Sequence, residues 1–439
     1  MAEPGRTYMQ IKVCICWHLK RMQVSKTFKS MDGIVSADNF ANIMGVSKAV
    51  LQKWENSGAF VPKTDGNGRK FFYVKDLLHV PEIRDMFDSS WEQEMEVLPV
   101  RPYTSIELFA GAGGLALGME KAGFSHVLLN EIDHDACATL QYNRPGWRVA
   151  EQDVRQISFR QFEGKVDFLS GGFPCQAFSY AGKQGGFNDT RGTLFFELAR
   201  AVQEVRPKVF MGENVKGLAA HDGGRTLATI KNTIKELGYT LVEPRVLRSI
   251  LFRVPQKRER LILVAIRNDF AGKVQFHWPS PFHRIMTLRD AFYKGDLYGC
   301  DVPVSDGQKY PLKKLKVMEM VPMGGYWRDL PIDVQREYMG GSFELEGGKT
   351  GMARRLSLDE PSLTLTCAPA QKQTERCHPI ETRPLTVREY ARIQTFPDEW
   401  RFSGTLSSQY KQIGNAVPVN LAYAVGRSLV RLLNDIERL

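Results

Sequence analysis

The stretch VDFLSGGFPCQAFSYAGKQGGF, residues 166–187, decides the fold and supplies the first chemical group. Its apolar start, residues 166–169, predicts a short buried strand, which Ser170 and two glycines end. Cys175 follows a proline, which has no amide hydrogen to continue the strand. Open α/β sheets bind ligands beyond the carboxyl ends of their strands, so Cys175 is a candidate nucleophile. A free cysteine is more often a small buried apolar residue, but these glycine-rich, polar neighbours favour a functional role.

A second apolar run, residues 209–212, ends in Glu213. Between the two runs, RGTLFFELARAVQEV (residues 191–205) has apolar residues at helical spacing. Strand, helix and strand predict parallel neighbours, whose carboxyl ends meet at one edge of a sheet. We therefore expect Cys175 and Glu213 to lie close together, although Glu213 alone would be interpreted as a solvated helix cap.

Six sequence blocks follow one another in an order typical of a single enzyme family. They are FAGAGG (109–114), FPCQ (173–176), ENV (213–215), QKRER (256–260), RPLTVREYARIQTFPD (383–398) and QIGNAVPVN (412–420). Together they resemble the DNA cytosine-5 methyltransferase family, from about Tyr103 to the C-terminus. The resemblance implies an α/β, Rossmann-like S-adenosylmethionine-dependent methyltransferase fold with a smaller target-recognition lobe.

The chemistry of cytosine methylation asks for the same residue types. Carbon 5 becomes nucleophilic only after a thiolate adds to carbon 6, and Cys175 is the predicted thiolate. Arg258 and Arg260 are the predicted source of the positive charge that lowers its pKa, although a surface pair on a strand is the alternative. Glu213, kept partly protonated by burial, is the predicted acid at ring nitrogen 3.

Residues 106–122 predict a strand, a glycine turn and a helix, which is a nucleotide-binding unit. The turn does not spell GxGxxG, so the glycines alone do not name the cofactor. The resemblance implies S-adenosylmethionine, with Phe109 on the adenine, Glu131 on the ribose and Asp153 on the adenine amine. The full set of predicted cofactor contacts is Phe109, Gly111, Gly113, Glu131, Asp153, Val154, Pro174, Leu194 and Asn415.

The charge of the chain agrees with a nucleic-acid partner. The net charge is +10, and residues 206–267 carry thirteen basic against five acidic side chains. Such an excess favours phosphate binding, although a basic run is usually a solvated face. An enzyme of this kind must flip its cytosine out of the duplex. The predicted DNA contacts are Gln176, Ser179, Lys349, Arg354, Arg355 and Thr364.

We expect five segments along the chain. They are a basic tail (1–30), a helix-rich winged helix-turn-helix domain (31–98), a catalytic lobe (103–275), a target-recognition lobe (276–407) and a segment that returns to the catalytic lobe (408–439). The run GVSKAVLQKWENSGAFVP, followed by GRKFFYVKDL, resembles the winged helix-turn-helix of the mercury-resistance regulator (MerR) type. It predicts DNA binding at a second site and autoregulation, and a helical brace for the catalytic lobe is the alternative.

The sequence predicts a bacterial DNA (cytosine-5) methyltransferase of a restriction-modification system, a monomer on double-stranded DNA, with a cognate restriction endonuclease as functional partner. Seven cysteines without a paired CxxC motif predict free thiols and no metal site. No apolar stretch is long enough for a membrane span, so we expect a cytoplasmic, nucleoid-associated protein. A tRNA cytosine-5 methyltransferase and a DNA-binding regulator with an inert methyltransferase domain are the alternatives. The large variable lobe favours DNA, and intact Cys175, Glu213 and Asn415 argue against inertness.

Overall fold

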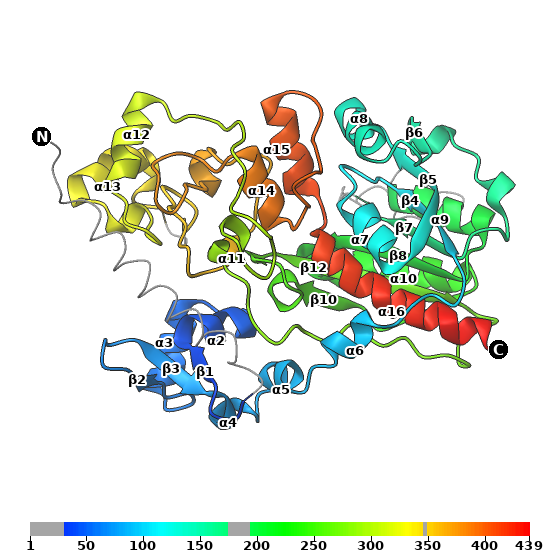
Figure 1. Cartoon of the computed structure of the whole chain (residues 1–439), viewed down its shortest axis with the longest axis horizontal. Coiled ribbons are helices and arrows are strands. Elements are labelled where there is room, and N and C mark those ends of the chain that lie inside the picture. The colour runs from blue at the N-terminus through cyan, green and yellow to red at the C-terminus, as the bar shows by residue number, and fades with distance from the viewer. Residues whose placement is uncertain (1–29, 174–193, 346–348) are drawn as a thin grey trace, which may run out of the picture. The chain divides into compact units, whose positions relative to one another are not determined.

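The computed structural model describes residues 30–173, 194–345 and 349–439, which form two compact units (Figure 1). The smaller unit contains the described residues up to 92 together with residues 280–285, and the larger unit contains the rest. No helix in the described ranges is long and apolar enough to span a membrane.

The larger unit is built on an eight-stranded sheet of order β10-β12-β8-β7-β4-β5-β6, with β9 also paired to β12. The strands are β4 (Tyr103–Leu108), β5 (Phe124–Glu131), β6 (Val149–Glu151), β7 (Phe168–Gly171), β8 (Val209–Val215), β9 (Tyr239–Leu241), β10 (Arg245–Arg248) and β12 (Glu259–Arg267). Strands β4 to β8 are parallel, while β12 is antiparallel to β8. The predicted α/β class is confirmed.

The predicted pairing of the first two strands is confirmed. β7 and β8 are parallel neighbours, and Gly171 lies opposite Gly212 at their carboxyl ends. β4 lies between β5 and β7, so the chain turns from one half of the sheet to the other at this strand. In open α/β sheets ligands bind at such a switch point, beyond the strand ends.

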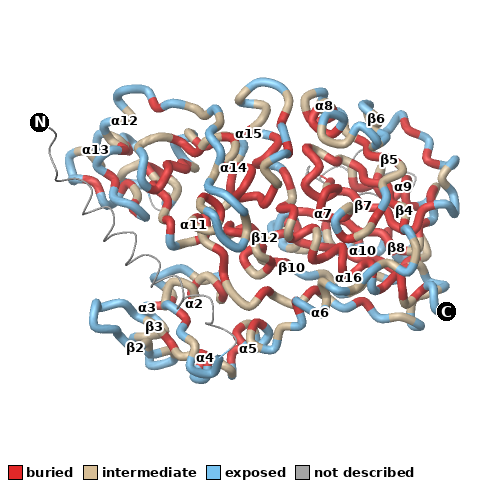
Figure 2. The backbone as a smooth tube through the Cα atoms, in the orientation of Figure 1, coloured by how far each residue is buried: buried red, intermediate tan, exposed pale blue. Residues whose placement is uncertain are grey.

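Helices cover both faces of this sheet. One face carries α7 (Gly114–Ala122), α8 (His134–Asn143) and α16 (Val419–Glu437), and the other carries α9 (Leu194–Val205) and α10 (Arg225–Glu236). Figure 2 shows buried residues concentrated in the strands and in these packed helices. α7 and α16 approach closely, because a Cβ on Gly118 would lie only 2.3 Å from the Ala422 Cβ.

Shorter elements lie between the strands of the sheet or follow its last strand. They are α11 (Leu288–Phe292), α12 (Leu312–Glu319), α13 (Ile332–Met339), the pair β11 (Gln256–Lys257) and β13 (Ser362–Leu363), α14 (Val387–Ile393), α15 (Leu406–Asn415), and the 3-10 turns η1 (Val154–Gln156), η2 (Arg160–Phe162), η4 (Lys216–Gly224), η5 (Ser249–Leu251), η6 (Trp327–Asp329), η7 (Gly340–Ser342) and η8 (Lys372–Thr374). A separate apolar cluster between Tyr310 and Cys377 gives this region a core of its own. Such a core is what the predicted target-recognition lobe requires.

The smaller unit combines short helices with a three-stranded sheet of order β1-β3-β2. Its elements are β1 (Ile34–Ser36), α2 (Ala37–Met44), α3 (Lys48–Asn56), β2 (Lys63–Thr64), β3 (Lys70–Tyr73), α4 (Val74–Leu77) and α5 (Pro81–Phe87); α6 (Trp91–Met95) follows. Ser36 and Ser47 cap α2 and α3 through their side chains, and Gly45 ends α2 in the left-handed conformation, with φ of 66°. Phe40 packs against Phe60 and Phe72 in its core.

Candidate active site

The carboxyl ends of β7 and β8 lie side by side. The Asn214 side-chain amide donates to the Phe173 carbonyl oxygen at 2.8 Å and so ties the two strand ends together. A Cβ on Gly172 would lie 3.1 Å from Glu213 Oε2, so a residue without a side chain leaves room for the carboxylate. The predicted residues Pro174, Cys175, Gln176 and Ser179 lie outside the described residues. The described chain thus brings the segment that precedes Cys175 directly to Glu213.

Glu213 is buried and paired with Arg260 on the neighbouring strand. Arg260 Nε lies 2.6 Å from Glu213 Oε1, and the two side chains are 11% and 10% exposed. Burial raises the pKa of Glu213, while the charges of Arg260 and Arg258 oppose that rise. Glu213 is therefore a weaker acid than glutamate in water, which favours a role as proton donor. The sequence predicted that the strand ends just before Glu213. In the structure β8 includes Glu213 and ends at Val215.

Arg258 is 2% exposed and bonds to backbone rather than to a carboxylate. Its Nη1 donates to the Leu365 carbonyl oxygen at 3.3 Å, and its Nη2 donates to those of Gly414 and Asn415 at 2.9 and 3.3 Å. Burial lowers the pKa of Arg258 to about 9, with repulsion from Arg260 contributing, so the side chain is still charged at neutral pH. Arg258 thereby fastens the segment after β13 to the end of α15.

The glycine loop after β4 adopts the left-handed backbone conformation at three positions. Phe109, Gly111 and Gly113 have φ values of 58°, 53° and 84°. A Cβ on Gly113 would lie 2.6 Å from Leu140 Cδ2, whereas no atom lies within 4 Å of the corresponding position on Gly111. A side chain at position 113 would press on Leu140, and the left-handed φ there also favours glycine. At position 111, backbone conformation alone favours glycine, and the space beside it is open.

Glu131, at the end of β5, holds this loop in place. Its Oε2 accepts from the Gly111 amide at 2.7 Å, and its Oε1 accepts from the amides of Ile132 and Asp133 at 2.8 and 2.9 Å. A carboxylate with this many backbone donors is well oriented. Glu131 lies beside the glycine loop at the edge where the sequence predicted a ribose contact.

The other predicted cofactor residues follow the carboxyl ends of neighbouring elements. Asp153, just after β6, accepts from the Arg155 amide at 3.0 Å and pairs with its guanidinium, which lowers the pKa of Asp153. Val154 is buried, and Leu194 is the half-buried first residue of α9. Asn415, the last residue of α15, is exposed. Because β4, β5 and β6 are parallel, Phe109, Glu131 and Asp153 follow one edge of the sheet.

One buried acid beside the site, Glu107 in β4, has no counterpart among the predicted residues. It is 2% exposed, and its Oε2 has no hydrogen-bond partner in the described part of the chain. Burial raises the pKa of Glu107 well above its usual value. A hydrogen bond from the Ala116 amide lowers this pKa, whereas the nearby Glu131 and Glu213 carboxylates raise it further. The raised pKa favours the protonated form of this carboxyl. In the sequence, the only sign of this buried acid is its position inside the apolar run SIELF, residues 105–109.

The predicted DNA contacts of the lobe differ in their surroundings. Arg355 is 4% exposed, and its guanidinium donates to the carbonyls of Val321 and Met318 at 2.7 and 2.6 Å. The structure therefore argues against Arg355 as a DNA contact, because its donors hold the lobe together. Half-buried Arg354 donates to the Gly324 carbonyl at 2.9 Å.

The two remaining lobe residues predicted to contact DNA also bond to backbone. Thr364 donates to the Lys257 carbonyl at 2.5 Å. Lys349 donates to the carbonyls of Ser342 and Leu345. Both side chains are only partly buried, so part of each faces solvent.

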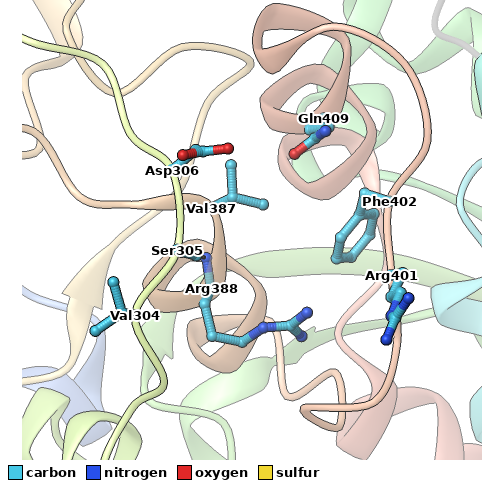
Figure 3. A pocket seen from close by; sticks show the side chains of 8 residues that line it. All are labelled: Val304, Ser305, Asp306, Val387, Arg388, Arg401, Phe402 and Gln409. Atoms are coloured by element: carbon cyan, nitrogen blue, oxygen red, sulfur yellow. Dashed lines mark hydrogen bonds between the residues drawn. The ribbon is translucent and has the colours of Figure 1, made fainter.

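A cavity of about 500 Å³ lies elsewhere, beside α14 and α15 (Figure 3). Its lining residues are Val304, Ser305, Asp306, Val387, Arg388, Arg401, Phe402 and Gln409. Arg388 donates to the carbonyls of Pro397 and Trp400, so its guanidinium binds the local backbone. None of the predicted site residues lines this cavity. Within the described ranges, no three His, Cys, Asp or Glu side chains cluster as a metal site.

Comparison with known proteins gives a consistent result. The family model described as C-5 cytosine-specific DNA methylase matches residues 103–431. The chain is 62% identical to the Type II methyltransferase M.Eco47II of Escherichia coli, over 92% of this chain and 97% of that protein. It is 58% identical to M.PspPI of a Psychrobacter species, over 92% and 98%. It is also 49% identical to M.Sau96I of Staphylococcus aureus, over 83% and 84%. The family model begins at residue 103, and the residues from there to the C-terminus make up less than 92% of the chain. The first two matches, which cover 92%, therefore extend into the N-terminal part.

Solved structures support the fold. The chain aligns with a structure described as a prophage-encoded DNA modification methyltransferase from E. coli, with a TM-score of 0.56 and 24% identity. The alignment covers 76% of this chain and 99% of that one. At this identity the likeness shows a common fold.

Proposed function

The chain belongs to the family of C-5 cytosine-specific DNA methylases, and we propose that it methylates its cytosine with Cys175 as nucleophile and Glu213 as acid. Its activity is DNA cytosine-5 methylation in a restriction-modification system. The observation that carries the residue roles is the buried Glu213–Arg260 pair, which lies where the segment leading to Cys175 leaves the sheet.

In the proposed reaction, the Cys175 thiolate adds to carbon 6 of the cytosine. Glu213 donates a proton or a strong hydrogen bond to ring nitrogen 3, which takes up the displaced electrons. Carbon 5 then takes the methyl group of the sulfonium donor, whose methyl–sulfur bond breaks and leaves its electron pair on the sulfur. A base removes the carbon 5 proton, the carbon 5–carbon 6 double bond re-forms, and the thiolate leaves. Arg260 keeps Glu213 oriented, and Arg258 supplies positive charge to the same edge.

S-adenosylmethionine supplies an electrophilic methyl group on a sulfonium, and the residues at this edge fit it. The backbone at Gly111 has open space beside it, so a flat or charged group can approach closely. We assign Phe109 and Val154 to the adenine, together with Pro174 and the Asp153 carboxylate. Glu131 takes the ribose hydroxyls, and Gly113 completes the loop. Leu194 and Asn415 line the methionine end.

The DNA partner follows from the reaction, and its contacts are proposed. Gln176 and Ser179 follow the nucleophile in sequence and would contact the DNA around the flipped base. Thr364, Arg354 and Lys349 lie partly exposed on the target-recognition lobe and would bind the phosphate backbone. We further propose that the protein acts as a monomer in the bacterial cytoplasm, on nucleoid DNA. A cognate restriction endonuclease is its functional partner and need not bind it.

Bisulfite sequencing of DNA and of tRNA from cells that express the chain tests this function. We expect conversion-resistant cytosines at one short site, and none in cells that express Glu213→Gln at the same level. Protection restricted to tRNA would support the tRNA alternative. Full conversion with the wild-type chain would support the inert regulator.

We propose that the smaller unit is a winged helix-turn-helix that binds DNA at a second site. In support, α2 and α3 are joined by a tight turn at Gly45, and the β2–β3 hairpin resembles a wing. Lys53 on α3 and Arg69 at the hairpin tip are exposed cations. By binding at the promoter of its own gene, the protein would repress its own transcription.

Charge reversal in the full chain tests the second site. Lys53→Glu with Arg69→Glu should abolish a footprint on the protein's own promoter, while methylation of plasmid DNA stays at the wild-type rate. Lys235→Glu, at an exposed lysine of α10 in the larger unit, is the control for a reversed surface charge. An unchanged footprint, or loss of methylation, would contradict the proposal.

A further inference from the structure

An exposed cysteine outside the proposed chemistry contacts a proposed cofactor residue. Cys367 follows β13 and is a free, exposed thiol. Its Sγ donates to Asn415 Oδ1 at 3.2 Å.

The backbone on both sides of this contact is rigid. Arg258 joins the Leu365 carbonyl to those of Gly414 and Asn415, as described above. A Cβ on Gly414 would lie 2.4 Å from the Thr366 carbonyl oxygen, so the two segments touch backbone to backbone. Because Cys367 and Asn415 extend from segments held in this way, their separation is set by the fold. The contact is more than a meeting of two mobile surface side chains.

The hydrogen bond determines which way the Asn415 amide faces. With Oδ1 accepting from the thiol, the amide nitrogen is directed to the opposite side. Among the described residues, Nδ2 donates to no protein acceptor, and Asn415 is exposed. A free primary amide on the surface can rotate, and the contact with the Cys367 sulfur restrains this rotation.

We propose that Cys367 is a positioning residue, whose thiol orients Asn415 so that Nδ2 is presented to the methionine end of the cofactor. The inference rests on the proposed function, because it assumes that Asn415 binds this ligand. Cys367 itself does not touch the reacting atoms and takes no part in the covalent step. Its contribution is to binding, so it affects KM for the cofactor rather than the maximal rate.

Two substitutions in the full-length protein test the role. Cys367→Ala removes the donor, and Cys367→Ser keeps one. Titration calorimetry with S-adenosylhomocysteine, which carries no methyl group to transfer, measures binding without turnover. We expect the alanine variant to bind about two- to fivefold more weakly, in keeping with one modest hydrogen bond. The serine variant should stay within about twofold of wild type. In methylation assays the alanine variant should raise KM for S-adenosylmethionine by the same factor and leave kcat unchanged.

Controls separate this inference from the proposed function. Cys300→Ala removes another exposed thiol, one that bonds to Asp398 and Arg392 and not to Asn415. This variant should bind S-adenosylhomocysteine as tightly as wild type. In an Asn415→Ala background, Cys367→Ala should cause no further loss. Wild-type affinity in Cys367→Ala, equal losses in the serine and alanine variants, or additive losses with Asn415→Ala would overturn the inference. Failure of the wild-type protein to bind the ligand at all would instead overturn the proposed function.

Discussion

Replacing Arg260 with methionine tests the electrostatics of the site. The substitution leaves the Glu213 carboxyl, which is 10% exposed, without the guanidinium that lies 2.6 Å away. Burial already raises the pKa of Glu213, and Arg260 is the largest influence that opposes the rise. In the variant the pKa of Glu213 should therefore rise further. The carboxyl will then bind a proton rather than stay as an unpaired buried anion.

The loss of stability should depend on pH. An acid whose folded-state pKa exceeds its unfolded value costs no stability below the unfolded pKa. The cost grows as pH rises from the unfolded to the folded pKa, and it stays constant above the folded pKa. Within that window the slope is about 1.4 kcal/mol per pH unit. Breaking a buried ion pair costs about 3–5 kcal/mol, which sets the upper limit. We expect the difference between Arg260→Met and wild type to be larger at pH 7.5 than at pH 5.5, with about 1.4 kcal/mol per pH unit as the upper limit of its slope.

Urea unfolding followed by circular dichroism at both pH values measures this difference. Arg225→Met is the matched control, because Arg225 pairs with Asp222 on the surface, where the side chains are 80% and 45% exposed. That variant should lose little stability at either pH. Adding Glu213→Gln to Arg260→Met should remove the pH dependence. An equal loss at both pH values, or no rescue by the second substitution, would refute the account of Glu213 as a buried acid of raised pKa.

Two further predictions concern packing and acid stability. Gly118→Ala should destabilise the protein by about 1–3 kcal/mol in urea unfolding, because its Cβ would meet Ala422 at 2.3 Å; Gly217→Ala, with open space around its Cβ, should change little. The pKa of Glu437 is lowered to about 2, chiefly by hydrogen bonds from Arg101, so it contributes stability above its unfolded pKa that is lost as pH falls through 2. Glu437→Gln should therefore be less stable at pH 6, and should lose less than wild type on acidification to pH 3 in the same assay.

The sheet could be predicted because its signals are local. Apolar runs at residues 166–169 and 209–212, with a helical pattern between them, were enough to predict two parallel neighbours, and the β7–β8 pairing confirms them. The glycines after β4 likewise marked the turn at which the loop begins. These features depend on residue type and spacing over a few positions.

Contacts between distant segments could not be predicted. Arg260 reaches Glu213 because β12 runs antiparallel to β8 and places Glu213 opposite Ile262, a register that no local pattern encodes. Arg355 looked like a DNA contact in a basic, glycine-rich stretch, yet the lobe folds around it. The burial of Glu107 could not be predicted either, because a single acid in a strand does not reveal that both faces of that strand are covered.

Covalent trapping on DNA tests the central claim most directly. In DNA with 5-fluorocytosine at the target position, the fluorine cannot leave carbon 5 as the proton does, so the enzyme should remain attached to carbon 6. We predict a denaturant-resistant protein–DNA adduct that requires S-adenosylmethionine, maps to the peptide containing Cys175, and disappears in Cys175→Ala. An adduct that persists in Cys175→Ala, or attachment through another residue, would contradict the account.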